Sequence, residues 1–243
     1  MILGAMGDAH GGKHFDGQMA DRLEDVDLLL MAGDIADGND IDSFAGVWGG
    51  VRKRYRGKAI AVFGNDEYEQ DRTAYRERFG DIIFLDDEAA DLDIGGTRLR
   101  VVGTSGSLDR PTWWQRTNLP KIGARYKRRV EKVRALLDRE GADLLILLSH
   151  YAPTYLTLEG ERPRAFPEMG SKAMEEAVLE KRPDLVIHAH AHSGTRHAVL
   201  GDIQRRLDRP EARIPIWNVS LPLNGRIVKL EVREGESDVR LLE

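Results

Sequence analysis

Short apolar runs recur along the chain, and most of them end in a glycine or serine that is followed by a polar residue. They are rich in Val, Ile and Leu, and runs of roughly four to eight such residues between turn signals are typical of strands buried on both faces. The pattern therefore predicts a buried sheet built from MILGAMGDAH, VDLLLMAGD, KAIAVFGND, RLRVVGTSGS, DLLILLSH and DLVIHAHAH.

Segments with helical spacing of apolar residues lie between these runs. They cover about residues 16–25, 40–54, 68–79, 124–140 and 171–182. The clearest is ARYKRRVEKVRALLDREGAD, in which Gly141 is a stop signal. Because strands and helices alternate, the pattern predicts an α/β layered fold.

The C-terminal third has a different pattern. RIPIWNVS, GRIVKLEVREG and DVRLLE are strand-like runs without helices between them, which indicates antiparallel strands that complete a second sheet or an edge. No linker rich in Pro, Gly or Ser and no internal repeat divides the chain. We therefore expect one domain over residues 1–243.

Composition narrows the class of protein. The 243 residues are 41% hydrophobic and 32% charged, as in folded globular proteins, and the net charge of −5 gives no basic surplus that would attract nucleic acid. No apolar run approaches the roughly 20 residues that cross a membrane, and the start MILGAMGDAHGG lacks the regions of a signal peptide. We expect a cytoplasmic protein without membrane contact. The absence of cysteine excludes thiolate catalysis and Cys-ligated metals.

The stretch DLVIHAHAHSG holds three of the seven histidines of the chain, His188, His190 and His192. Side chains alternate along an extended chain, so residues two apart can point to the same side. The alternatives are a surface strand with histidines and a tract that binds stray metal. A shared role gains weight if carboxylates follow other strands.

Polar residues do follow the other strands, and sites in open α/β sheets form beyond the carboxyl ends of strands. Each residue has another interpretation, because an Asp can cap a helix, an Asn can sit in a turn and a His can be structural. Their joint occurrence favours a site for two divalent cations, since oxygen and nitrogen donors without sulfur suit Mn²⁺, Fe²⁺ or Zn²⁺. The candidates are Asp8, His10, Asp34, Asn65, His150, His190 and His192.

The motifs GDAH, GDIAD, GNDE, SH and AHAH occur in this order between Asp8 and His192. They resemble the motifs of the calcineurin-like metallophosphoesterases, which are D-x-H, G-D-x-x-D, G-N-H-[DE], H and G-H-x-H. The resemblance implies an α/β fold of two mixed β-sheets packed face to face with helices on the outside, a four-layer αββα sandwich.

The resemblance also implies a ligand set and a reaction. Asp34 would bridge two cations, with Mn²⁺ expected first and Fe²⁺, Zn²⁺ or Ni²⁺ as alternatives. Such a pair can hold the phosphoryl oxygens and acidify a water, so that hydroxide attacks phosphorus in line. The implied function is a dinuclear metal-dependent phosphoesterase acting on a phosphodiester or phosphomonoester. One cation would be held by Asp8, His10, Asp34 and His192, and the other by Asp34, Asn65, His150 and His190.

Two candidate catalytic residues need separate treatment. Asp66 stands where the family has the histidine usually thought to protonate the leaving oxygen. An Asp has a reference pKa of about 3.9 and would be a poor donor beside two cations. Asp66 is therefore kept protonated, or another group such as His14 replaces it, or the substrate needs little help. His188 either orients a ligand, contacts phosphate, or is a packed strand histidine.

Substrate contacts are less defined. Trp113, Trp114 and Arg116, in a predicted loop over residues 105–120, could stack on a base or aryl group and pair with its phosphate near Asn65. Alternatively the tryptophans cover the core. We expect a small-molecule phosphate ester or nucleotide as substrate, and no nucleic-acid or membrane partner. The alternative function is a non-catalytic scaffold of this fold that binds a protein partner, but the filled ligand positions favour an enzyme. Gly38, where the family's protein phosphatases carry Arg, disfavours a Ser/Thr protein phosphatase.

Overall fold

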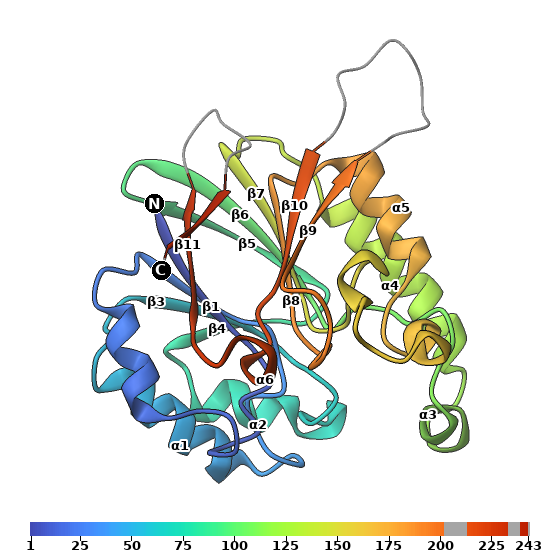
Figure 1. The fold of residues 1–243 in the computed structure, drawn as a ribbon, viewed down its shortest axis with the longest axis horizontal. Helices are drawn as coiled ribbons and strands as arrows, with labels where there is room; N and C mark the ends of the chain where they lie inside the picture. The colour runs from blue at the N-terminus through green and yellow to red at the C-terminus, as the bar shows by residue number, and fades with distance from the viewer. Residues whose placement is uncertain (202–212, 233–238, 243) are drawn as a thin grey trace.

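The computed structural model describes residues 1–201, 213–232 and 239–242. Two mixed six-stranded sheets pack face to face, and helices cover their outer sides (Figure 1). The predicted α/β sandwich is therefore confirmed. The last residues of the predicted run GRIVKLEVREG, from Arg233 on, lie outside the described residues.

The first sheet has the strand order β12-β11-β1-β2-β3-β4. Its parallel strands are β1 (Ile2–Met6), β2 (Leu28–Met31), β3 (Lys58–Val62) and β4 (Ile82–Leu85). The C-terminal strands β11 (Val228–Val232) and β12 (Val239–Leu242) join antiparallel, as the sequence predicts.

The second sheet has the order β5-β6-β7-β8-β10-β9. Its parallel strands are β6 (Thr97–Thr104), β7 (Leu144–Ser149), β8 (Leu185–His188) and β10 (Arg213–Asn218). The antiparallel edges are β5 (Glu88–Ile94) and β9 (His197–Gly201). The expectation that β10 is antiparallel is wrong with respect to β8, because the unpredicted strand β9 reverses the chain between them.

Most of the larger helices match the predicted segments. They are α1 (Ile41–Arg52), α2 (Arg72–Arg78), α4 (Ile122–Leu136) and α5 (Lys172–Lys181), and residues 17–23 form a 3₁₀ helix. The predicted loop over residues 105–120 contains α3 (Trp113–Asn118), which corrects that expectation. Thr112 and Gln115 form a reciprocal capping box at its start, and this local bonding supports a helix of only six residues. Short helices also span Glu69–Asp71, Leu156–Leu158, Pro163–Glu168 and Leu221–Asn224.

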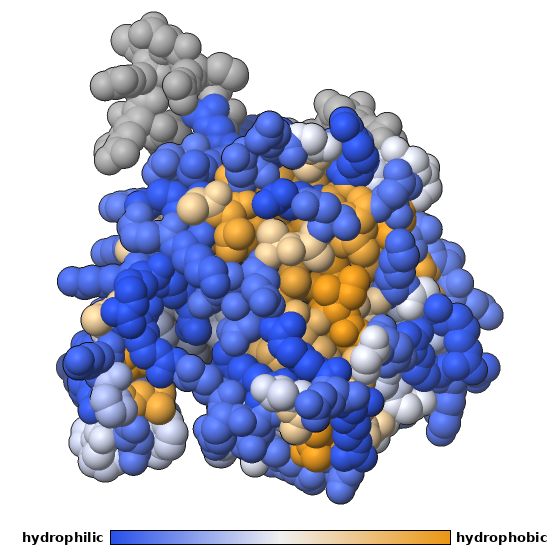
Figure 2. All heavy atoms as spheres, turned by 180° about the vertical axis from the view of Figure 1, so that it is seen from behind, coloured by the Kyte–Doolittle hydropathy of each residue, from blue (hydrophilic) through white to orange (hydrophobic). Residues whose placement is uncertain are grey.

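A core between the sheets holds the two layers together. Leu3, Leu30 and Ile60 of the first sheet and Ile146 and Ile187 of the second are fully buried in it. Burying one such side chain is worth about 1.5 to 3 kcal/mol. On the face opposite to Figure 1, apolar side chains gather in the middle of the molecule inside a hydrophilic frame (Figure 2). The sandwich is thus not covered by polar residues on every side.

Candidate metal centre

The parallel strands bring the predicted ligands to one edge of the sandwich. Loops follow β1, β2 and β3 in the first sheet and β7 and β8 in the second. Among the described residues three groups form, and within each the ligand atoms lie within 4.8 Å of one another; the third, His10, Asp37 and Asp66, shares His10 with the first. We call Asp8, His10 and His192 the outer group and Asp34, His150 and His190 the inner group. Asn65 joins the inner group, since its Oδ1 lies 3.1 Å from His150 Nε2.

Four ligand residues have a left-handed backbone. The φ angles are 55° at Asp8, 43° at His10, 50° at Asp34 and 69° at His190. Residues with a Cβ rarely adopt this region, and each instance costs of the order of 1–3 kcal/mol. Hydrogen bonds between the loops after β1 and β2 hold it in place, from the Asp8 amide to the Gly33 carbonyl and from the His10 amide to the Asp34 carbonyl, both 3.0 Å. Strain at so many predicted ligands is typical of a functional site.

The glycines of the motifs make room for the inner group. A Cβ on Gly64 would lie 2.1 Å from Asp34 Oδ1, and one on Gly33 would lie 2.9 Å from His150 Nδ1. Both distances are too short for a carbon atom. Any side chain at these positions would displace a predicted ligand, which explains the Gly before Asp34 and the Gly before Asn65.

Glu67 ties the inner loops together, although the sequence reasoning gave it no role. Its buried carboxylate accepts hydrogen bonds from the amides of Asp34 (2.9 Å), Ala36 (2.9 Å) and Gly64 (2.8 Å). Burial, followed by the negative charge of Asp34, raises the pKa of Glu67 to about 7. The final acidic position of the GNDE motif was the available signal for this role.

Three acceptor atoms converge in the inner group. His150 Nδ1 donates to the Ala32 carbonyl at 2.9 Å, so the lone pair of the neutral ring is on Nε2. That atom faces Asn65 Oδ1 at 3.1 Å and Asp34 Oδ2 at 3.4 Å. The Asn65 amide nitrogen donates to Asp66 Oδ1 at 3.1 Å, which turns its oxygen toward His150. Facing lone pairs repel one another, so this arrangement fits a cation.

The outer group contains buried polar atoms without partners. Asp8 Oδ1 and His10 Nε2 have no hydrogen-bond partner, whereas buried polar atoms in proteins are nearly always bonded. The other oxygen of Asp8, Oδ2, accepts from the His190 amide at 2.8 Å and so links the two groups. Oxygen and nitrogen donors with lone pairs left over fit divalent ions such as Mn²⁺, Fe²⁺ or Zn²⁺.

The imidazoles of the two groups have opposite pKa shifts. Removal of water around the rings lowers the pKa of His150, and it lowers that of His190 to about 3 with help from the nearby charge of His150. The hydrogen bond with Asp66 raises the pKa of His10, and the Asp8 carboxylate, whose Oδ1 lies 3.5 Å from His192 Nε2, raises that of His192. The inner imidazoles are therefore neutral and ready to bind a cation, while the outer ones compete for protons.

Asp66 lies beside the outer group as a hydrogen-bond acceptor. Its Oδ2 is 3.0 Å from His10 Nδ1 and accepts from the Gly38 amide at 3.2 Å. The hydrogen bond with His10 lowers the pKa of Asp66, which disfavours the protonated form that a donor to the leaving group needs. The exposed ring of His14 lies 5.9 Å from that of His10 and 6.2 Å from that of His192, between centroids.

His188 does not face the two groups as an open ligand. It is fully buried, its Nδ1 donates to the Ala189 carbonyl at 2.8 Å, and its Nε2 accepts from the Thr157 hydroxyl at 2.7 Å. Because both ring nitrogens are occupied, the geometry corrects the expectation that His188 contacts phosphate. It favours the packed strand histidine.

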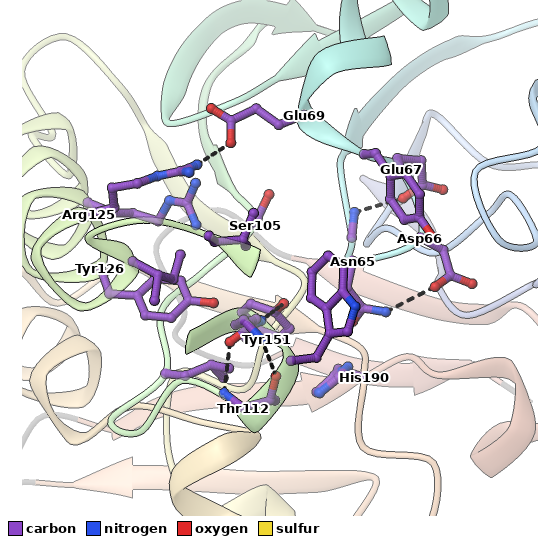
Figure 3. A pocket seen from close by; sticks show the side chains of 18 of the residues that line it. Asn65, Asp66, Glu67, Glu69, Ser105, Thr112, Arg125, Tyr126, Tyr151 and His190 are labelled. Atoms are coloured by element: carbon purple, nitrogen blue, oxygen red, sulfur yellow. Dashed lines mark hydrogen bonds and ion pairs between the residues drawn. The ribbon is translucent and has the colours of Figure 1, made fainter. Parts of the chain in front are cut away.

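A cavity of about 580 Å³ adjoins the inner group. Figure 3 shows Asn65 and His190 on one side of it and Tyr126 and Tyr151 on another. Trp114 lines this cavity, whereas Trp113 and Arg116 do not. Trp113 is 69% exposed, and Arg116 donates to the carbonyl of Pro111. Of the substrate contacts predicted in this segment, the structure brings Trp114 alone to the site.

Comparisons with known proteins identify the family and the fold. The sequence profile of the calcineurin-like phosphoesterases matches residues 1–194, and the chain belongs to that family. No curated protein matches the chain significantly. None of the described helices combines the length and apolar composition needed to cross a membrane.

Solved structures share the fold at low sequence identity. TT1561 of Thermus thermophilus is 13% identical with a TM-score of 0.60, and the match covers 99% of this chain and 97% of that one. GAP50, the anchor in the inner membrane complex of Plasmodium, is 12% identical with a TM-score of 0.53 over 90% and 71% of the chains. The calcineurin-like phosphoesterase YfkN from Bacillus subtilis is 13% identical with a TM-score of 0.51 over 99% and 87%.

Proposed function

We propose that this protein is a dinuclear metal-dependent phosphoesterase that hydrolyses a small phosphomonoester or phosphodiester. The observation that carries the proposal is the convergence of seven residues with oxygen or nitrogen donors, five of which present lone pairs that face one another or lack partners. Membership of the calcineurin-like family supports the same reaction class.

The outer group would hold one cation, and the inner group with Asn65 would hold the other. Asp34 would bridge, as the family resemblance implies. Mn²⁺ is the first candidate, with Fe²⁺, Zn²⁺ and Ni²⁺ as alternatives, because the donors are imidazole, carboxylate and amide oxygen. When bound, such a pair stabilises charge on the phosphoryl oxygens and acidifies a water molecule.

The residues of the chain prepare this chemistry. The Ala32 carbonyl fixes the tautomer of His150, so that Nε2 offers its lone pair. Glu67 holds the loops of Asp34 and Asn65 at their spacing through the amides of Asp34 and Gly64. Asp66 accepts a hydrogen bond and does not offer a proton. Departure of the leaving group would therefore proceed with little protonation by this side chain.

A non-catalytic scaffold would not require the ligand residues to be arranged for metal binding. A scaffold has no need for neutral imidazoles, aligned tautomers or a strained backbone at the ligand positions. The strained backbone occurs in both groups, and the inner group has the neutral imidazoles and the fixed tautomer of His150. They support an enzyme over a scaffold.

Metal analysis and a chelator test decide the matter. The protein would be stripped with a chelator, reloaded with Mn²⁺ and assayed on 4-nitrophenyl phosphate and bis(4-nitrophenyl) phosphate. His150→Ala should lose bound metal and activity, while the control His197→Ala should keep both, since His197 lies outside both groups and stacks on Trp217. Full activity of a protein in which metal analysis detects no metal would overturn the proposal.

A further inference from the structure

The proposed hydrolysis at the two groups does not use the cavity beside the inner group. It adjoins Asn65 and His190, so the organic part of a phosphate ester held at the centre would extend into it (Figure 3). Its volume of about 580 Å³ lies within the range of roughly 300–1,000 Å³ found for small-ligand sites. The cavity is large enough for a group of nucleoside size.

The cavity has no surplus of positive charge. Three arginines line it, but each is paired: Arg72 with Asp86 at 2.7 Å, Arg129 with Asp87 at 2.9 Å, and Arg125 with Glu69. The lining also includes four acidic residues, Asp66, Glu67, Glu69 and Glu168. A second phosphate inside the cavity would therefore meet no unpaired arginine of the lining.

The walls suit a flat ring. Tyr126 and Tyr151 are almost completely buried, and their rings meet edge to face with centroids 6.4 Å apart. Leu108 and Ile122 pack against them in one apolar cluster. Trp114 also lines the cavity and leaves 54% of its surface exposed. Aromatic walls of this kind stack on rings and tolerate different ring types.

We propose that this cavity binds the uncharged, ring-bearing part of the substrate, a nucleoside or a comparable aryl alcohol esterified to a single phosphate. The proposal rests on the phosphoesterase function proposed above. It assigns Trp114 a role in specificity and predicts discrimination against substrates that carry a further phosphate on the ring-bearing part.

The neighbouring tryptophans provide a matched pair of variants. Trp114→Ala should raise KM for a nucleoside 5′-monophosphate about tenfold, the scale of one lost base–aromatic contact, with kcat little changed. Methyl phosphate, which has no ring, should be unaffected. Trp113→Ala should change neither substrate, because Trp113 does not line the cavity. Equal effects of the two variants would overturn the proposal.

A substrate with a second phosphate tests whether the cavity lacks unpaired positive charge. A nucleoside 3′,5′-bisphosphate offers the same 5′ ester with one more phosphate, and its kcat/KM should be at least about tenfold lower than that of the 5′-monophosphate. Equal values would contradict the proposal.

Binding of the free nucleoside to metal-free protein, followed by tryptophan fluorescence in wild type and in the Trp114 variant, separates the ring-site proposal from the phosphoesterase proposal. Nucleoside binding without hydrolysis of any ester would sink the phosphoesterase and leave the ring site standing. Hydrolysis of esters without nucleoside binding would support the phosphoesterase and overturn the ring site.

A second inference concerns Asp66 and rests on a different observation. His10 Nδ1 lies 3.0 Å from Asp66 Oδ2, while His10 Nε2 is buried without a partner on the side of the outer group. A carboxylate accepts but does not donate when ionised, so the ring proton belongs on Nδ1 and the lone pair on Nε2. Metal-binding histidines commonly have their other nitrogen held by a carboxylate in this way.

The geometry points to Asp66 as a positioning residue that fixes the tautomer and direction of His10. Loss of such a carboxylate typically weakens metal binding about 10- to 100-fold. Asp66→Ala should weaken Mn²⁺ binding to the stripped protein within that range, and Asp66→Asn should restore part of it, because an amide oxygen still accepts from Nδ1. The control is Asp71→Ala, since Asp71 accepts a hydrogen bond from Asn39 and belongs to none of the groups that could hold a metal ion.

The tautomer itself can be measured without metal or turnover. Nitrogen NMR of metal-free wild type should show the His10 proton on Nδ1, and Asp66→Ala should shift it toward a mixture. Asp71→Ala should leave it in place. A proton on Nε2 in the wild type, or metal affinity that does not change in Asp66→Ala, would overturn the assignment.

Discussion

The outer and inner groups share ligand chemistry but differ in their contact with water. The side chain of His192 in the outer group is 40% exposed and that of His10 is 16% exposed, whereas the side chain of His150 in the inner group is fully buried and that of Asp34 is 3% exposed. The pKa shifts follow this difference, upward for His10 and His192 and downward for His150 and His190. Burial therefore prepares the inner group for a cation, and carboxylate partners prepare the outer one.

The largest effect should come from the inner group. Asp34→Asn keeps the shape of the side chain but removes the negative charge that would hold the proposed cations, so hydrolysis of 4-nitrophenyl phosphate should fall by about a thousandfold or more. His192→Ala, at the exposed edge of the outer group, should cost less. Steady-state rates with circular dichroism as a folding control check this ranking. Equal losses from both variants would remove the distinction between the groups.

The lowered pKa of Asp66 leaves this side chain ionised and without a proton for the leaving oxygen, which predicts a strong dependence on the leaving group. General acid catalysis contributes about 10²–10⁴-fold, so nitrophenyl esters should be cleaved at least about a hundredfold faster than alkyl esters. Asp66→His should favour the alkyl esters selectively, because an imidazole titrates near neutrality. The measurement is kcat/KM over phenyl esters of graded acidity. A shallow dependence in wild type that steepens in Asp66→Asn would show that Asp66 is itself the acid.

Acid should affect the outer group first. A raised pKa means that His10 and His192 take up protons above pH 6.5, the ordinary value, and a protonated ring cannot bind a cation. The lowered pKa values of His150 and His190 keep those rings neutral in the same range. Activity at limiting Mn²⁺ should thus fall as the pH drops below about 7, and added Mn²⁺ should restore it. A loss that excess Mn²⁺ cannot reverse would argue against proton competition.

The smallest effect concerns stability beside the inner group. Burial lowers the pKa of His188 from 6.5 to about 4. Below pH 6.5 the unfolded chain takes up a proton that the folded chain refuses, so stability falls as the pH drops and the loss is complete near pH 4. The scale is about 3 kcal/mol. In urea unfolding of metal-free protein, His188→Gln should flatten this slope between pH 4.5 and 6.5. An unchanged slope would mean that His188 titrates normally.

The spacing of apolar residues predicted an α/β fold, and the family resemblance implied the sandwich. The proposed ligands could be named because strand-end motifs are local signals that parallel strands bring together. The sequence could not decide whether His188 faces the two groups, because the alternation of side chains along a strand holds only where the strand continues. β8 ends at His188, and the left-handed turn at His190 breaks the alternation. The pairing of Arg125 with Glu69 joins residues that are 56 positions apart in the sequence. No local pattern encodes such contacts, so the cavity was missed with them.

The central claim is that the centre holds two cations at sites of different proton sensitivity. Anomalous diffraction from crystals equilibrated with Mn²⁺ tests it most directly, at pH 7.5 and again at pH 5.5. We expect two anomalous peaks at the higher pH, one in each group. At the lower pH we expect a single remaining peak, in the inner group among Asp34, His150 and His190. A single peak at pH 7.5, or loss of the inner peak before the outer one, would contradict it.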